Sequence, residues 1–91
     1  LVFDTNTRLF GLAGETLALT PREHAVLEQL VLKAGQTVSK AMLSAAIYDF
    51  EADADPSAIE IYVHRLRKKL EGGSVRIVTL RGLGYLLKAE E

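Results

Sequence analysis

The stretch that most constrains the fold of this chain is residues 57–70, SAIEIYVHRLRKKL. At about 100° per residue, one narrow stripe of a helix collects Ile59, Val63, Leu66 and Leu70, which predicts an amphipathic helix that buries this stripe. The opposite side of that helix carries cations, one aromatic ring and small apolar groups: Ala58, Ile61, Tyr62, Arg65, Lys68 and Lys69.

This second side of the helix holds cations but no acid, whereas a solvated helix face ordinarily mixes both signs. Cations beside apolar tips suit a DNA major groove, where cations meet phosphates and guanine edges and apolar tips meet thymine methyl groups. The alternative is an amphipathic helix that merely ends in a basic turn, because cations also stabilise a helix C-terminus. The helix alone leaves both interpretations open.

Length and composition bound the class of protein. The chain has 91 residues, 48% hydrophobic and 25% charged, which is typical of one small globular domain over residues 1–91. Cysteine is absent, which excludes a disulfide framework and a thiolate metal site. No apolar run reaches the ~18 residues of a membrane span, and no signal-peptide pattern opens the chain. Because the sequence starts with Leu1 rather than Met, we expect it to be part of a longer protein.

The charge is distributed unevenly along the chain, although the net charge is only −1. Residues 1–56 hold four Lys and Arg against eight Asp and Glu, whereas residues 57–91 hold seven against four. Such asymmetry suggests a polyanion as partner of the second half and a different partner for the first.

The N-terminal half predicts short strands and then a helix. The strand-like segments lie at 1–4, 7–12 and 15–19. Three such strands are not stable alone and must pack on helices. Thr20, Pro21 and Glu23 then form a helix start, since Thr20 can cap, Pro21 suits the first position and Glu23 completes a capping box. Gly35 is expected to end this helix.

A second helix is predicted from Lys40 to about Ile47, capped by Ser39. We expect its inward side to carry Met42, Leu43, Ala46 and Ile47. His24, on the first helix, is expected at the surface, because a lone histidine without nearby ligands rarely carries special chemistry.

The C-terminal part predicts the third helix and a hairpin. We expect the helix to begin near Pro56, capped by Asp55, and to end at Gly72. Segments 75–80 and 85–87 read as strands joined by a turn with a basic tip at Arg81. Arginine is favoured in narrow minor grooves, so a basic tip next to a basic helix favours DNA.

Catalytic motifs are missing from the sequence: there is no nucleophile elbow, zinc-protease motif, phosphate loop or dinucleotide fingerprint, and we expect no enzyme and no cofactor. Carboxylates between Asp49 and Glu60 do fall at the spacing of a calcium loop. However, Ala54 stands where that loop needs glycine, and Pro56 restricts the backbone, so we expect no metal.

The acidic loop at 48–56 places aromatic residues among its acids. This pattern favours a protein-docking loop, far from any phosphate. A merely solvated loop is the alternative, since charged loops are usually only that.

Four motifs stand in register along the chain: LTPRE at 19–23, VSKAML at 38–43, VHRLRKKL at 63–70 and LRGLGYLL at 80–87. On these motifs the sequence resembles the winged-helix output domain of OmpR/PhoB-type response regulators. The resemblance implies an α+β winged helix-turn-helix, with a four-stranded N-terminal antiparallel sheet, three helices and a C-terminal β-hairpin wing. It also implies a short strand near Thr37 and Val38 that pairs with the wing.

The resemblance implies roles for individual residues. The residues expected at base edges are Ala58, Ile61, Tyr62, Arg65 and, from the wing, Arg81. The residues expected at phosphates are Tyr48, Ser57, His64, Arg67, Lys68, Thr79 and Tyr85. The residues expected to contact RNA polymerase are Asp49, Phe50, Glu51 and Asp53.

Taken together, we expect a transcription regulator's output domain in the bacterial cytoplasm, controlled by an N-terminal phosphorylatable receiver domain. By the resemblance, two copies bind direct-repeat half-sites of double-stranded DNA as a homodimer, and no membrane is involved. The alternative is a winged-helix protein-interaction module, in which the same helix binds an acidic protein surface.

Overall fold

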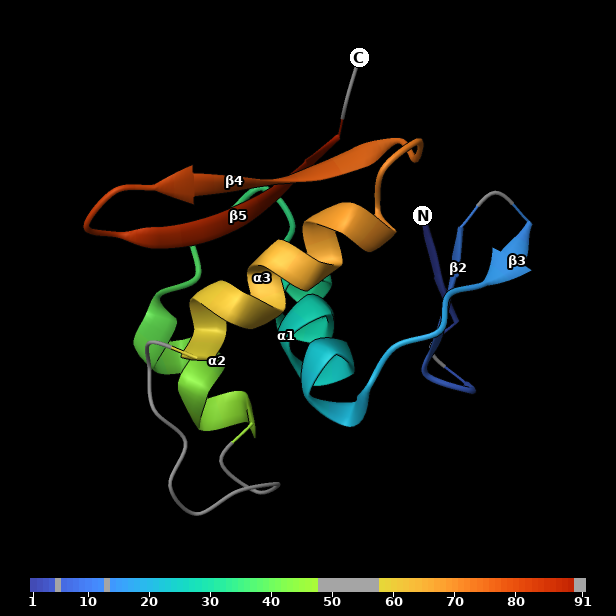
Figure 1. The fold of residues 1–91 in the computed structure, drawn as a ribbon, viewed down its shortest axis with the longest axis horizontal. Coiled ribbons are helices and arrows are strands. Elements are labelled where there is room, and N and C mark those ends of the chain that lie inside the picture. The colour runs from blue at the N-terminus through green and yellow to red at the C-terminus, as the bar shows by residue number, and fades with distance from the viewer. Residues whose placement is uncertain (5, 13, 48–57, 90–91) are drawn as a thin grey trace.

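The computed structural model describes residues 1–4, 6–12, 14–47 and 58–89. Its elements follow in the order β1 (Val2–Asp4), β2 (Leu9–Leu12), β3 (Glu15–Thr16), α1 (Pro21–Leu32), α2 (Lys40–Ile47), α3 (Ala58–Lys69), β4 (Val75–Leu80) and β5 (Gly84–Ala89). This confirms the predicted order of strands, helices and hairpin. The three helices lie between the N-terminal strands and the C-terminal hairpin (Figure 1). No helix in the described ranges is long and apolar enough to cross a membrane.

The N-terminal sheet is antiparallel in the order β1-β2-β3, with Phe3 opposite Phe10 and Gly11 opposite Thr16. The resemblance implied four strands, but only three are formed here by the residues that the structure describes. The Leu17 amide still donates to the Phe10 carbonyl at 2.7 Å. Beyond it the chain turns into the cap of α1, which removes the residues that a further strand would need.

Helix α1 begins as its sequence predicts. The Thr20 hydroxyl accepts a hydrogen bond from the Glu23 amide at 3.2 Å, and the Glu23 carboxylate accepts one from the Thr20 amide at 3.0 Å. Both bonds of the capping box are therefore present, with Pro21 at the first helical position. The chain leaves the helix through Gly35, whose φ of 81° is a conformation that favours glycine.

Helix α2 occupies the predicted residues, and the Ser39 hydroxyl accepts a hydrogen bond from the Met42 amide at 3.1 Å. The prediction that Met42 points inward is wrong, because its side chain is 42% exposed. Only Leu43 and Ile47 of this helix are buried. This short helix packs on the core through Leu43 and Ile47, which are four residues apart and lie on one side. Met42 lies on another side of the helix and stays exposed.

Helix α3 confirms the buried stripe that opened the sequence argument. Ile59, Val63, Leu66 and Leu70 are at most 3% exposed. They join a core with residues from β2, α1, the segment before α2, α2, α3 itself and the hairpin: Phe10, Val26, Leu27, Leu30, Val38, Leu43, Ile47, Tyr62, Ile77, Tyr85 and Leu87. The buried side of α3 thus fixes which side remains outside.

Strands β4 and β5 form a hairpin, which we call the wing (residues 75–89), with Leu80 opposite Gly84 at its tip. Val38 pairs with Tyr85, which confirms the predicted pairing of this segment with the wing. Two backbone hydrogen bonds of 2.7 and 2.9 Å hold the pair. A Cβ on Gly84 would collide with the Val38 backbone, so glycine is what permits this close approach. The wing therefore lies against the segment that leads into α2.

Candidate nucleic-acid interface

The exposed side of α3 is the first part of the site. Ile61 is 53% exposed, and His64, Arg65 and Lys68 are exposed as well, whereas Ala58 is partly covered. The domain's own strands leave this side bare. The helix thus presents cations around one apolar tip, as the sequence predicted.

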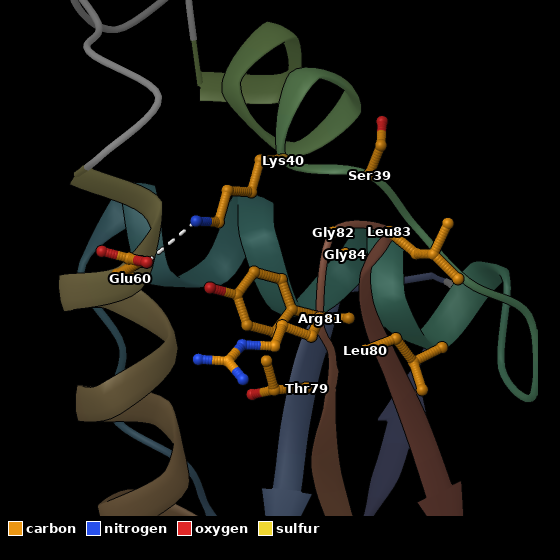
Figure 2. Close-up of a pocket in the computed structure, with 10 residues that line it drawn as sticks. Ser39, Lys40, Glu60, Thr79, Leu80, Arg81, Gly82, Leu83 and Gly84 are labelled. Atoms are coloured by element: carbon orange, nitrogen blue, oxygen red, sulfur yellow. Dashed lines mark hydrogen bonds and ion pairs between the residues drawn. The ribbon is translucent and has the colours of Figure 1, made fainter.

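The wing tip is the second part of the site. Arg81 is exposed in the turn between β4 and β5, and a hollow of about 460 Å³ separates the tip from α3. Figure 2 shows the Arg81 and Thr79 side chains extending from the wing toward α3 across this hollow. The wing tip thus lies next to α3, as the sequence analysis expected of a basic tip beside a basic helix, and Glu60 is the α3 residue that lines the hollow between them.

An acid that the sequence analysis considered only for a calcium loop lines this hollow. Glu60 of α3 is paired with Lys40 of α2, with 2.8 Å between carboxylate oxygen and ammonium nitrogen. The hydrogen bond that Lys40 donates to the Glu60 carboxylate raises the pKa of Lys40 above its ordinary value. Figure 2 shows the pair spanning the two helices. The two residues are 20 positions apart, so no local pattern predicts the pairing.

The prediction that Tyr62 lies on the exposed side of α3 is wrong. Tyr62 is only 9% exposed and belongs to the core, because α1 packs against its side of α3. Arg22 of α1 donates a hydrogen bond to the Tyr62 hydroxyl at 3.3 Å. The two side chains line a shallow hollow together with Thr20, Pro21 and Arg65.

Lys69 also lies away from the groove side where the sequence placed it. Its ammonium nitrogen is 2.5 Å from the carboxylate of Glu23, which is 1% exposed, and it donates to the Ala18 carbonyl at 3.1 Å. Burial by itself raises the pKa of Glu23, but the hydrogen bonds from Lys69 and Thr20 outweigh it and lower that pKa. Lys69 therefore ties α3 to the start of α1.

Two of the predicted phosphate contacts, the exposed Arg67 and the buried Tyr85, have bonding partners within the fold. Arg67 donates from Nε and Nη2 to the Ile77 carbonyl at 3.2 and 3.1 Å, and from Nη2 to the Thr79 hydroxyl. Tyr85 is only 3% exposed, and its backbone pairs with Val38. Its small exposed part lines the hollow at the wing.

His24 is half covered rather than simply at the surface. Its ring lies 5.1 Å from that of Phe10, and its Nε2 is hydrogen-bonded to the Arg8 carbonyl. Arg8 in turn forms a two-pronged ion pair with Glu28 of α1. These contacts hold the N-terminal sheet on α1, away from the bare side of α3.

Several predicted residues lie outside the described ranges: the phosphate candidates Tyr48 and Ser57, the cap Asp55 and the polymerase candidates Asp49, Phe50, Glu51 and Asp53. Most of the calcium-like spacing lies there as well. Among the residues that the structure does describe, no group of three His, Cys, Asp or Glu could hold a metal ion.

Residues 14–87 match the family described as "Transcriptional regulatory protein, C terminal". The transcriptional regulatory protein TctD of Salmonella typhimurium is 49% identical over 79 residues, which cover 87% of this chain and 35% of TctD. The transcriptional regulatory protein BasR of Escherichia coli is 40% identical over 91 residues, which cover 100% of this chain and 40% of BasR. The chain thus spans a third to two fifths of the length of these relatives.

Solved structures give the same result. The DNA-binding domain of the response regulator AdeR, in complex with an intercistronic region, superimposes with a TM-score of 0.83 at 26% identity, over 97% of this chain and 93% of that one. The Klebsiella pneumoniae RstA DNA-binding domain in complex with the RstA box gives a TM-score of 0.74 at 31% identity, over 92% and 86% of the two chains. Both were solved with DNA.

Proposed function

Because the chain belongs to the family of C-terminal domains of transcriptional regulatory proteins, we propose that it binds double-stranded DNA sequence-specifically as the output domain of a two-component response regulator. In this role it controls transcription. One observation carries the proposal: α3 leaves Ile61 and Arg65 exposed, and the exposed wing tip with Arg81 faces the same helix across one hollow. A helix and a basic tip on one flank match adjacent major and minor grooves.

The residue roles follow from exposure. Arg65 hydrogen-bonds a guanine edge in the major groove, and Ile61 contacts a thymine methyl group beside it. Ala58 has only a small side chain and sits against the same base edges. Arg81 enters the minor groove. Tyr62 is dropped from this set because of its burial.

The proposed phosphate contacts come from both elements. His64 and Lys68 project from the bare side of α3, and Thr79 faces the hollow at the wing. Tyr48 and Ser57 stay in this set on the resemblance alone. Phosphate contacts hold the domain in register on the duplex without reading sequence.

The finer partners are part of the same proposal. Two copies bind direct-repeat half-sites about one helical turn apart. The acidic loop with Asp49, Phe50, Glu51 and Asp53 contacts RNA polymerase, since acids around an aromatic ring are repelled by DNA and suit a protein surface. The relatives are longer than this chain, which supports a receiver domain in the intact protein that controls DNA binding.

Selection from a random duplex library tests the function directly. We expect the 91-residue chain to enrich one sequence and to bind it more tightly than random DNA in a gel shift. If about six phosphates are contacted, log affinity falls with log salt at a slope near −5. A salt-independent affinity, or no enriched sequence, contradicts the proposal and favours a protein-interaction module instead.

Arg65→Ala tests the base reader. We expect it to cost about 1–3 kcal/mol on the selected sequence and to relax the preference at one base pair. Arg76→Ala is the matched control, because Arg76 is also an exposed arginine but lies in β4 at the end far from the wing tip. Equal losses for Arg65→Ala on selected and random DNA would show that Arg65 reads no base.

A further inference from the structure

We propose that Arg67 is a positioning residue that holds the wing at a fixed orientation to α3, so that Arg81 reaches the minor groove while α3 occupies the major groove. The inference rests on the proposed function and deepens it. It differs from the role that the resemblance implies for Arg67, which is a direct phosphate contact.

The backbone pattern of the wing explains why Arg67 is needed. The Tyr85 backbone is bonded to Val38, and the Leu87 carbonyl accepts from the Gly35 amide at 3.1 Å, so both residues turn their backbone groups away from β4. In an antiparallel ladder their partners turn away as well. Ile77 pairs with Leu87, so the Ile77 carbonyl points out of the hairpin on the free edge of β4.

Arg67 supplies the donors for that free edge. Its Nε and Nη2 both donate to the Ile77 carbonyl, at 3.2 and 3.1 Å, and Nη2 also donates to the Thr79 hydroxyl. A planar guanidinium can make this fork, whereas a lysine ammonium cannot reproduce it. The wing is thus held on both edges, by the segment around Val38 on β5 and by Arg67 on β4.

The Arg67 contacts lie close to the wing tip. Ile77 and Thr79 are two residues apart and lie on one face of β4, and Arg81 follows in the turn directly after the strand ends at Leu80. Figure 2 shows that Thr79 and Arg81 both extend toward α3. A change in the angle of β4 against α3 therefore moves Arg81 relative to the bare side of the helix.

A double-mutant comparison separates the two roles of Arg67. We measure affinity for the selected duplex with Arg67→Lys, Arg81→Ala and the two combined. Arg67→Lys keeps the positive charge but loses the fork. For a positioning role we expect a loss of about tenfold for each single variant, in the range of one specific contact. The affinity of the double variant should then be no more than about twofold below that of Arg81→Ala, because both changes remove the same contact.

A phosphate contact predicts a different outcome. Arg67→Lys would then keep most of the affinity, the losses of the two changes would multiply, and Arg67→Ala would lower the salt slope by about one. Lys68→Ala serves as control, because Lys68 is the exposed neighbour proposed to contact phosphate and should show this additive behaviour with Arg81→Ala. Multiplying losses for Arg67→Lys would overturn the proposal.

A second measurement uses the free protein and does not depend on DNA. In nuclear magnetic resonance spectra, we expect the Nε proton of Arg67 to exchange with water at least tenfold more slowly than that of Arg76, and Arg67→Lys to shift the amide signals of residues 81–83. Equal exchange at Arg67 and Arg76 overturns the proposal even if the domain binds DNA. Failure of the library selection instead contradicts the proposed function.

Discussion

Replacing Lys69 by methionine should destabilise the domain strongly, because it leaves the Glu23 carboxylate without its cation. Glu23 is 1% exposed, and the Lys69 nitrogen lies 2.5 Å from its oxygen. Methionine is one heavy atom shorter than lysine, but it keeps an unbranched apolar stem and removes the charge and its donors.

The magnitude follows from the burial of the two partners. Removing one partner of a fully buried pair costs about 3–5 kcal/mol. The Lys69 side chain is 35% exposed, so water can partly replace its ammonium group. We therefore expect a loss below that range, about 2–3 kcal/mol, close to the contribution of a hydrogen bond to a charged group. In a domain of this size that corresponds to a fall in the melting temperature of about 10–20 °C.

Thermal and urea unfolding at pH 7, followed by circular dichroism, measure this loss. Lys68→Met is the matched control on the exposed side of the same helix and should change the free energy of unfolding by less than about 0.5 kcal/mol. Glu23→Gln combined with Lys69→Met should recover at least half of the loss, because glutamine still accepts the Thr20 amide but carries no charge. A loss below about 0.5 kcal/mol for Lys69→Met would refute the reasoning.

The same pair makes stability depend on pH. The pKa of Glu23 is lowered in the folded state from its ordinary value of 4.5. A lowered carboxyl pKa contributes stability that is present above the ordinary value and is lost as the pH falls through the folded-state pKa. The wild-type and Lys69→Met proteins should therefore converge in free energy of unfolding at acid pH. A difference in free energy of unfolding that stayed constant down to about pH 2 would show that the Glu23–Lys69 pair is not its cause.

Two further predictions separate the fold from the site. Gly84→Ala should cost at least about 2 kcal/mol in urea unfolding, because φ is 141° and a Cβ would meet the Val38 backbone. Gly82→Ala is the comparison, since φ is also positive there, at 77°, but the space around it is open; equal losses would show that the Val38 backbone collision adds nothing. Ile61→Asn should leave the free energy of unfolding within about 0.5 kcal/mol but change the base selected opposite it; an unchanged selected sequence would remove Ile61 from the interface.

Much of this architecture is predictable from short-range patterns. The capping box at Thr20 and Glu23, the bounds of α2 and β4 and the buried stripe of α3 all appear as expected. Helix caps and periodicities act between residues a few positions apart, so the local sequence is enough to specify them. The family motifs added the pairing of Val38 with the wing, which no local rule contains.

The partners of individual side chains on α3 depended on packing. Periodicity placed Tyr62 and Lys69 on the outer side of α3. In the structure α1 covers Tyr62, and Glu23 of α1 forms an ion pair with Lys69. Arg67 bonds to β4, ten positions away from Ile77, and Lys69 bonds to Glu23, 46 positions away. Which cation of the helix stays available and which one holds the fold together was decided by the elements that surround it. The reason is physical: a helical sequence defines angles around its own axis, whereas the neighbours that fill those angles come from distant parts of the chain.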